Sequence, residues 1–148
     1  MLKKIINDEQ VTAKEIAGLI CDVEDTLQNE IFYSSVRSQK KEKEAIKHST
    51  FITMRNLEDK DTIVGLVRII GDSTYEYYIS EVMVAPEYQN QGIGTKLMNT
   101  ALDYCKDNGF MKIFLTAAHG REPYYRRFGF KDTKYSVMRI LNETKREK

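Results

Sequence analysis

The first part of the chain has apolar residues at the spacing of an α-helix. Five of them fall on one helical face: Ile16, Leu19, Ile20, Val23 and Leu27. This predicts a helix over roughly residues 12–27, capped by Asp8 or Thr12. Residues 37–47 mix charges of both signs and predict a second helix with its charged side chains in water.

Strand patterns follow. Residues 49–55, 62–70 and 74–84 are rich in β-branched and aromatic residues, and turn-like segments separate them at 56–61 and 71–73. Residues 62–70 are apolar enough to be a central strand. We therefore expect an antiparallel meander.

The pattern changes in the second half. A helical period runs through Leu97, Met98, Ala101, Leu102 and Cys105, and Gly109 marks its end. Residues 110–117 predict a buried strand, 122–128 a short helix and 135–141 a last strand. This alternation of strand and helix implies parallel crossovers. With no linker or repeat, residues 1–148 are interpreted as one domain.

Composition narrows the class of protein. The 148 residues are 41% hydrophobic and 30% charged with a net charge of +1, which favours neither nucleic acid nor an anionic membrane. No apolar run approaches the length that spans a bilayer. Cys21 and Cys105 lie in apolar helical patterns and are interpreted as reduced core thiols of a cytoplasmic protein. No His, Cys and Asp cluster has metal-ligand spacing.

A glycine pair, Gly92 and Gly94, lies where a strand gives way to a helix. The start of a helix attracts phosphate, and glycine lets a phosphate approach the backbone. The sequence fits neither the Walker pattern nor the dinucleotide fingerprint. On these residues alone, a purely structural turn remains an alternative.

Two segments together resemble the GCN5-related N-acetyltransferase (GNAT) family. The stretch VMVAPEYQNQGIGTKLM is similar to the family's coenzyme A motif, with Gln89, Gly92 and Gly94 at its defining positions. The stretch EPYYRRFGF is similar to its second segment, an aromatic pair followed by Gly-Phe. Together with the intervening strand, they cover about a third of the chain.

The resemblance implies an α+β fold, in which a twisted mixed sheet lies between helices and two parallel strands splay apart. It also implies acetyl-CoA as co-substrate, with the pantetheine arm along the strand and the pyrophosphate on the glycine turn. The contacts it implies are Val82, Met83, Val84, Gln89, Asn90, Gln91, Gly92, Ile93, Gly94, Thr95 and Tyr125.

The resemblance further implies direct transfer of the acetyl group to an amine. Tyr125 matches the family's acid, which stabilises the departing thiolate, and Tyr124 is expected to be a packing residue. Glu81 is the candidate base, although strict alternation would turn it away from the face of Val82 and Val84 unless the strand bulges there. Tyr78 and Ser80, on the alternate parity, are candidates for substrate binding.

The acceptor is the open question. Phe32 and Tyr33 are candidates to line its pocket, or else to pack on the core. We expect an enzyme that acetylates a small primary amine, as a monomer or homodimer. A protein N-terminus or lysine as acceptor, or an acyl-CoA sensor without turnover, are the alternatives. His119, where many relatives carry asparagine, is expected to be an exposed loop residue.

Overall fold

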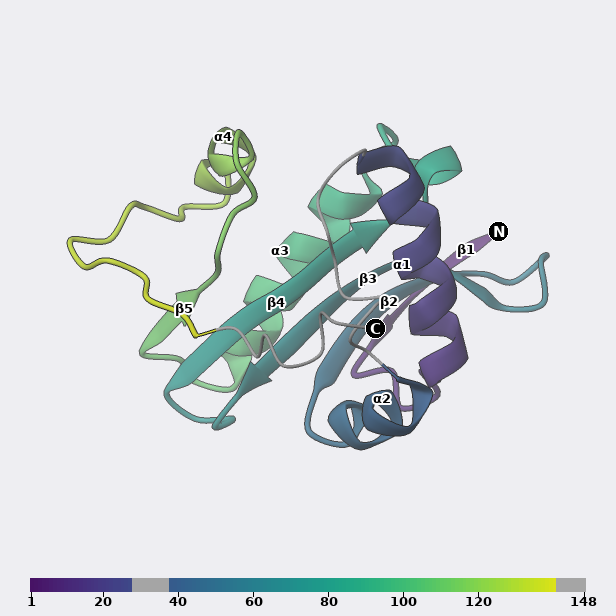
Figure 1. Cartoon of the computed structure of the whole chain (residues 1–148), viewed down its shortest axis with the longest axis horizontal. Helices are drawn as coiled ribbons and strands as arrows, with labels where there is room; N and C mark the ends of the chain where they lie inside the picture. The colour runs from purple at the N-terminus through teal and green to yellow at the C-terminus, as the bar shows by residue number, and fades with distance from the viewer. Residues whose placement is uncertain (28–37, 141–148) are drawn as a thin grey trace. The chain divides into compact units, whose positions relative to one another are not determined.

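A five-stranded sheet forms the frame of residues 1–116 (Figure 1). Its strands lie side by side in chain order: β1 (Leu2–Ile6), β2 (Thr50–Asn56), β3 (Thr62–Gly71), β4 (Glu76–Val84) and β5 (Lys112–Phe114). The pairs from β1 to β4 are antiparallel, and β4 with β5 is parallel. The computed structural model describes residues 1–27 and 38–140, and residues 117–148 form a separate unit.

The predicted meander is confirmed, with β3 in the centre of the sheet. The parallel crossover from β4 to β5 is also confirmed. The edge strand β1 was not predicted, because its sequence LKKII is short and carries two lysines. Lysines are common on edge strands, where they discourage pairing with other chains. The interpretation of residues 1–148 as one domain stays a prediction.

Helices cover both faces of this sheet (Figure 1). One face carries α1 (Ala13–Leu27), and α2 (Gln39–Ile46) packs beside α1. The other face carries α3 (Ile93–Asp107). Gly65 marks the α3 face, since a Cβ there would lie 2.9 Å from Leu97 Cδ1. Among the described helices, none is both long and apolar enough to cross a membrane.

The start of α1 is fixed by a reciprocal cap. Glu15 N donates to Thr12 Oγ1 at 3.2 Å, and Thr12 N donates to Glu15 Oε2 at 2.9 Å. Two of the helix's unpaired donors are thereby satisfied. Thr12 is therefore the cap, and the other candidate, Asp8, has a different role.

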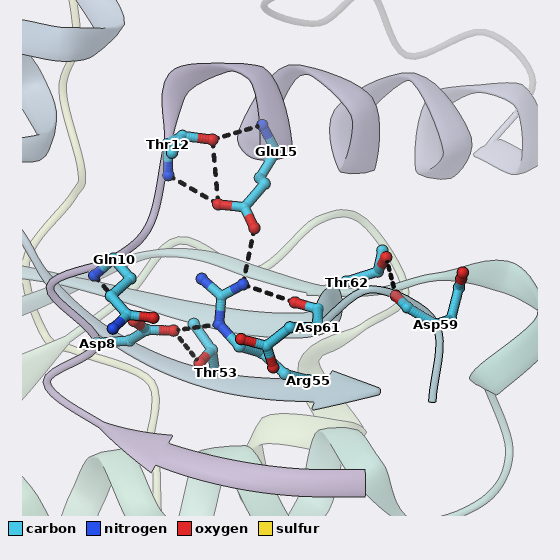
Figure 2. A network of polar contacts seen from close by, with 9 residues as sticks. All are labelled: Asp8, Gln10, Thr12, Glu15, Thr53, Arg55, Asp59, Asp61 and Thr62. Atoms are coloured by element: carbon cyan, nitrogen blue, oxygen red, sulfur yellow. Dashed lines mark hydrogen bonds and ion pairs between the residues drawn. The ribbon is translucent and has the colours of Figure 1, made fainter. Parts of the chain in front are cut away.

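Asp8 belongs to a buried polar network beneath α1 (Figure 2). Its carboxylate, in a residue only 4% exposed, accepts from Thr53 Oγ1 at 2.6 Å and from Arg55 Nε at 2.7 Å. Arg55 Nη1 also donates to Glu15 Oε1 at 2.7 Å. The network ties the start of α1 to β2, and burial makes each charge depend on its partner.

We expect Asp8→Asn to lower the free energy of unfolding at pH 7 by about 3 kcal/mol, because it breaks a buried ion pair. Burial alone would raise the pKa of Asp8, but hydrogen bonds from Thr53, Arg55 and Gln10 outweigh it and hold that pKa below its ordinary value. The ionised group therefore stabilises the fold above pH ~4, and this contribution is lost as pH falls through the lowered pKa.

Urea unfolding between pH 7 and pH 2 measures this effect. Asp8→Asn should flatten the acid end of the stability curve. The exposed Asp22 on α1 is a matched control, and Asp22→Asn should stay within about 0.5 kcal/mol of the parent. Equal stability of Asp8→Asn and the parent at pH 7 would contradict the network's role.

The predicted last strand is wrong. Within the described part of residues 135–141, no strand forms, and the apolar side chains lie open, with Met138 91% and Ile140 99% exposed. A strand needs a neighbour to satisfy its backbone donors and acceptors. Among the described residues, this segment has no ladder partner, so apolar composition alone does not make it a strand.

Three expectations about burial are also wrong. The strand expected to be buried over residues 110–117 forms only as β5, and Phe114 in it is 45% exposed. Cys21 is exposed, so only Cys105 is a core thiol. Burial raises the pKa of Cys105 to about 11, which makes it unreactive. The second helix is confirmed as α2, with Ser38 as its cap, but its face is not fully in water because Glu42 is buried.

Candidate functional site

The outer edge of β4 is paired with a neighbouring strand over only part of its length. β5 pairs with β4 only between Glu76 and Tyr78, whereas β4 continues to Val84. In the described residues no other strand lies on that side of β4. An open strand edge can pair with an extended ligand as with an added strand. All three residues of β5 pair with β4, so the open edge arises because β5 ends at Phe114, and the splaying of two parallel strands stays a prediction.

A β-bulge interrupts β4 at Ser80. Arg68 of β3 faces Glu81, but the next residue, Ile69, faces Ile79, which leaves Ser80 without a register partner on β3. A bulge of this kind reverses the side on which later residues of the strand lie. Strict alternation therefore does not hold across Ser80, although Glu81 still lies opposite Val82 and Val84, as alternation predicted.

The bulge decides which β4 side chains lie together. Before it, Tyr77 is buried on the α3 face near Cys105, and after it Val84 is on that same face, opposite Gly65. Met83 packs against the α1 core cluster. Tyr78, Glu81 and Met83 therefore share the face covered by α1 and α2. The expectation that Tyr78 and Glu81 lie on opposite faces is wrong.

Glu81 lies in a buried charged cluster on this face. Its Oε2 is 3.6 Å from Nη1 of Arg68, and the same nitrogen is 3.0 Å from Oε1 of Glu42 on α2. The Glu81 side chain is 11% exposed. The candidate base is thus shielded from most solvent.

Tyr78 and Ser80 flank this position. The Tyr78 hydroxyl lies 3.1 Å from Thr116 Oγ1, and its ring centroid is 5.1 Å from that of Phe114. Ser80 Oγ is buried and has no hydrogen-bond partner among the described residues. A buried hydroxyl without a partner can accept or donate a bond to a ligand or a water. Their roles in substrate binding stay predictions.

The glycine turn is built for close approach. Gly92 is the N-cap of α3, with a φ of 79° that favours glycine, and no side chain caps the helix there. No atom lies within 4 Å of the place a Gly92 Cβ would take. The first amides of a helix lack intrahelical partners and carry a positive partial charge. The turn therefore fits a phosphate group.

The amide side chains around the glycines brace the turn. Gln89 Nε2 donates to Val84 O at 2.9 Å, and Gln91 Nε2 donates to Glu87 O at 3.1 Å. Asn90 has a φ of 59°, a conformation that asparagine tolerates better than most residues. The side chains of Gln89 and Gln91 hold the backbone in place. The contacts with acetyl-CoA expected of residues 82–84 and 89–95 stay predictions.

Residues 117–148 form the second unit, which contains α4 (Glu122–Arg126). Tyr125 in α4 packs edge-on against Tyr124 and Phe130, with ring centroids 5.1 Å and 6.3 Å away. Burial raises the pKa of Tyr125, so its hydroxyl keeps its proton at neutral pH. Arg126 pairs with Asp132 at 3.0 Å.

The sequence profile described as the acetyltransferase (GNAT) family matches residues 20–130. The chain belongs to the GNAT acetyltransferase family. The match covers both segments that carry the resemblance, and it includes the bulged strand and the glycine turn.

Curated relatives are similar over part of the chain. N-alpha-acetyltransferase 30 of Schizosaccharomyces pombe is 33% identical over 93 residues, which are 58% of this chain and 62% of the relative. The N-acetyltransferase ycf52 of Porphyra purpurea, itself uncharacterized, is 30% identical over 96 residues, which are 64% of this chain and 55% of the relative. The chain thus spans little more than half the length of these relatives.

Solved structures support the fold of this GNAT chain. A GNAT family acetyltransferase from Streptococcus pneumoniae superposes with a TM-score of 0.74 at 23% identity, covering 97% of this chain and 99% of that one. Glucosamine-6-phosphate N-acetyltransferase from Arabidopsis thaliana has a TM-score of 0.67 at 12% identity, covering 96% and 99%. The predicted α+β fold, with a mixed sheet between helices, is confirmed.

Three further residues that the sequence singles out are Phe32, Tyr33 and His119. Phe32 and Tyr33 lie outside the described residues. His119 is exposed, as expected. The described part of the GNAT chain has no group of three or more His, Cys, Asp or Glu residues placed to hold a metal ion.

Sequence reasoning missed Arg68 and Glu42. The signal was present, since Arg68 is the one charged residue in the apolar stretch TIVGLVRII. A charged residue in a buried strand needs a partner of opposite charge. Glu42 was overlooked because it lies in a run of charges, QKKEKE, of which only this one is buried.

Proposed function

We propose that the protein transfers an acetyl group from acetyl-CoA to a primary amine while both substrates are bound. The open edge of β4 carries this proposal. From Ile79 onward the strand is free of β5, and it presents Glu81 just past the bulge. The chain then runs from Val84 through residues 85–92 to the start of α3, where no side chain caps the helix. One ligand with a peptide-like arm and a diphosphate would fit both features.

Acetyl-CoA would bind along this edge. Backbone groups of residues 82–84 would pair with the pantetheine arm, and amides of residues 90–95 would hold the pyrophosphate. Val84 O already accepts a bond from Gln89, so the arm would pair with the remaining backbone groups there. The co-substrate supplies an activated acetyl group, held as a thioester.

The reaction needs three proton transfers. Glu81 would take a proton from the ammonium form of the acceptor, directly or through a water, so that the nitrogen lone pair can attack the acetyl carbon. A C–N bond forms, and the C–S bond breaks with its electron pair going to sulfur. The Tyr125 hydroxyl would donate its proton to the departing thiolate, and the nitrogen would pass its extra proton through water to the resulting tyrosinate, which leaves the neutral amide, the free thiol and a protonated Glu81.

The acceptor class is proposed as a small primary amine. A protein N-terminus is the second candidate, and the similarity to a protein named N-alpha-acetyltransferase 30 favours it. The proposal includes no metal, nucleic acid or membrane, and it assigns the protein to the cytoplasm as a monomer or homodimer.

The test is release of free thiol from acetyl-CoA with a panel of acceptors. Small amines, peptides with free N-termini and peptides with internal lysines form three arms, each compared with the rate without acceptor. Turnover on a small amine supports the proposal. Turnover on peptides alone would favour the second candidate acceptor, a protein N-terminus, over a small amine. Tight binding of acetyl-CoA without turnover on any arm would favour the sensor alternative and overturn the enzymatic proposal.

Gly94→Val tests the diphosphate site. Gly94 lies in the first turn of α3, and its φ is not in the left-handed region, so a side chain brings no backbone strain of that kind. We expect acetyl-CoA affinity to fall about 100-fold, because the new side chain would displace a charged group from backbone donors. Isothermal titration calorimetry measures the change.

Gly18→Val is the matched control. Gly18 is exposed in α1, and a Cβ there meets no atom within 4 Å. The same substitution in a helix should therefore leave affinity unchanged. Unchanged affinity in a folded Gly94→Val protein would remove the glycine turn from the site.

A further inference from the structure

An aromatic side chain links the glycine turn to a strand that is distant in the sequence. Tyr88 ends the short helical turn η2 (Pro86–Tyr88), and residues 89–91 alone separate it from Gly92. Its hydroxyl accepts a hydrogen bond from Asn56 Nδ2 at 3.1 Å, across 32 positions of the chain. Asn56 is the last residue of β2. This bond therefore holds the segment that leads into the turn against the end of β2.

Asn56 is a fixed anchor for this bond. Its backbone lies between two neighbouring strands, opposite Leu2 of β1 and Thr62 of β3. Its side chain is held at both ends, because Oδ1 accepts from Glu58 N at 3.1 Å while Nδ2 donates to Tyr88. An amide held in this way has a defined orientation, so its donor points in a set direction.

The ring of Tyr88 is also held in place. It is partly buried against the apolar cluster that α1 shares with β2 and β3, a cluster that includes Ala85. Ala85 N donates to Val64 O of β3 at 2.8 Å, and Tyr88 N donates to Ala85 O at 2.8 Å. The ring, the backbone and the hydroxyl together fix the point on the sheet from which the glycine turn begins.

The bonds made by the two glutamines of the turn are local by comparison. Gln89 Nε2 donates to Val84 O, five residues away. Gln91 Nε2 donates to Glu87 O, four residues away. Local bonds give a turn its shape but do not determine where it lies on the sheet. Asn90 between them has a left-handed φ of 59°, a conformation that persists where the surrounding structure holds it.

We propose that Asn56 and Tyr88 are positioning residues for the diphosphate of acetyl-CoA. Their bond holds the turn so that its backbone donors point toward the place of the phosphates before the co-substrate binds. Donors fixed in advance bind more tightly, because the entropy of ordering them is not lost on binding. This inference rests on the proposed binding of acetyl-CoA at the glycine turn. It adds an anchor on β2, outside the stretch from Val82 to Met98 that carries the motif.

Two single variants and their combination measure the effect. Tyr88→Phe removes the hydroxyl and keeps the ring, and Asn56→Ala removes the donor. Each should raise the dissociation constant of acetyl-CoA about threefold to tenfold, the effect of losing one neutral hydrogen bond. Because both act through the same bond, the double variant should bind about as weakly as the weaker single variant. Isothermal titration calorimetry measures these constants.

A truncated co-substrate separates positioning of the turn from a general effect on the fold. S-acetylpantetheine carries the thioester and the arm but no diphosphate. Its dissociation constant, measured by NMR titration, should be unchanged in Tyr88→Phe, whereas that of acetyl-CoA rises. A role confined to stability would weaken the binding of both ligands.

Tyr75→Phe is the matched control. Tyr75 is 61% exposed and directly precedes β4, at the end of the strand away from the glycine turn. Removing its hydroxyl should leave the affinity for both ligands unchanged. Circular dichroism and urea unfolding show whether each variant is folded at the temperature of the titration.

Weaker binding confined to acetyl-CoA, with effects that do not add in the double variant, supports the inference. Unchanged affinity in a folded Tyr88→Phe protein, equal losses for both ligands, or additive losses in the double variant would overturn it. Should one single variant fail to fold, the other decides by the same comparison of the two ligands. Failure of the proposed function is distinguishable, because it shows in the parent protein as absence of acetyl-CoA binding, whereas failure of this inference shows only in the variants.

Discussion

Glu81→Gln is expected to lower kcat by about 10²- to 10³-fold with little change in the KM for acetyl-CoA. The substitution keeps the size of the side chain and removes its capacity to take a proton. The bulge at Ser80 puts Glu81 beside Arg68 on a shielded face, next to the part of β4 that β5 leaves open. A base needed only in the chemical step affects kcat and spares co-substrate binding.

The pH dependence of kcat gives a more specific test of Glu81 as the base. If Glu81 accepts the proton, the parent loses activity on the acid side as Glu81 becomes protonated, and the Gln variant loses that limb. Glu76 at the start of β4 is a matched control, because its carboxylate is half exposed and pairs with Lys112 at 2.9 Å. Glu76→Gln should retain parental kcat. A Glu81→Gln protein with the parent's profile would assign the base to another group.

Much of the fold could be predicted because it depends on local pattern. The spacing of apolar residues predicts the helix over residues 16–27, and β-branched and aromatic residues between turn-like segments predict the strands from residue 50 to 84. The edge strand β1 was missed because its stability comes from pairing with β2, a non-local contact. Residues 135–140 show the reverse case, in which a strand pattern has no neighbour among the described residues.

The site could be predicted only in outline for a related reason. The glycine turn is a local signal, because Gly92 needs a left-handed φ and Gly94 opens a helix. That Tyr78 and Glu81 share one face depends on one extra residue in β4, which no pattern of alternation reveals. Its partnership with Arg68 and Glu42 joins three elements far apart in sequence. The structure therefore adds what the sequence does not show, which is how charged side chains of different elements lie beside one another.

Tyr125→Phe is expected to lower kcat by about 10²-fold and to leave acetyl-CoA binding near normal. Breaking the thioester puts negative charge on sulfur, and a hydroxyl within reach of it can supply a proton, an effect typically worth ~10² to 10⁴ in rate. Burial raises the pKa of Tyr125, so the group is protonated throughout the neutral range. Its titration should thus lower the rate only in strongly alkaline solution.

The neighbouring tyrosine gives the control for this prediction. Tyr124 and Tyr125 are adjacent in α4 with ring centroids 5.1 Å apart, and the Tyr124 ring also packs against Phe128. Each Phe variant loses one oxygen and keeps its ring, so circular dichroism should show both folded. Thiol release at saturating acetyl-CoA should fall in Tyr125→Phe and barely change in Tyr124→Phe. Full activity of Tyr125→Phe, with chemistry rate-limiting, would mean that water or another residue protonates the thiolate, because the only atom removed is the proposed donor.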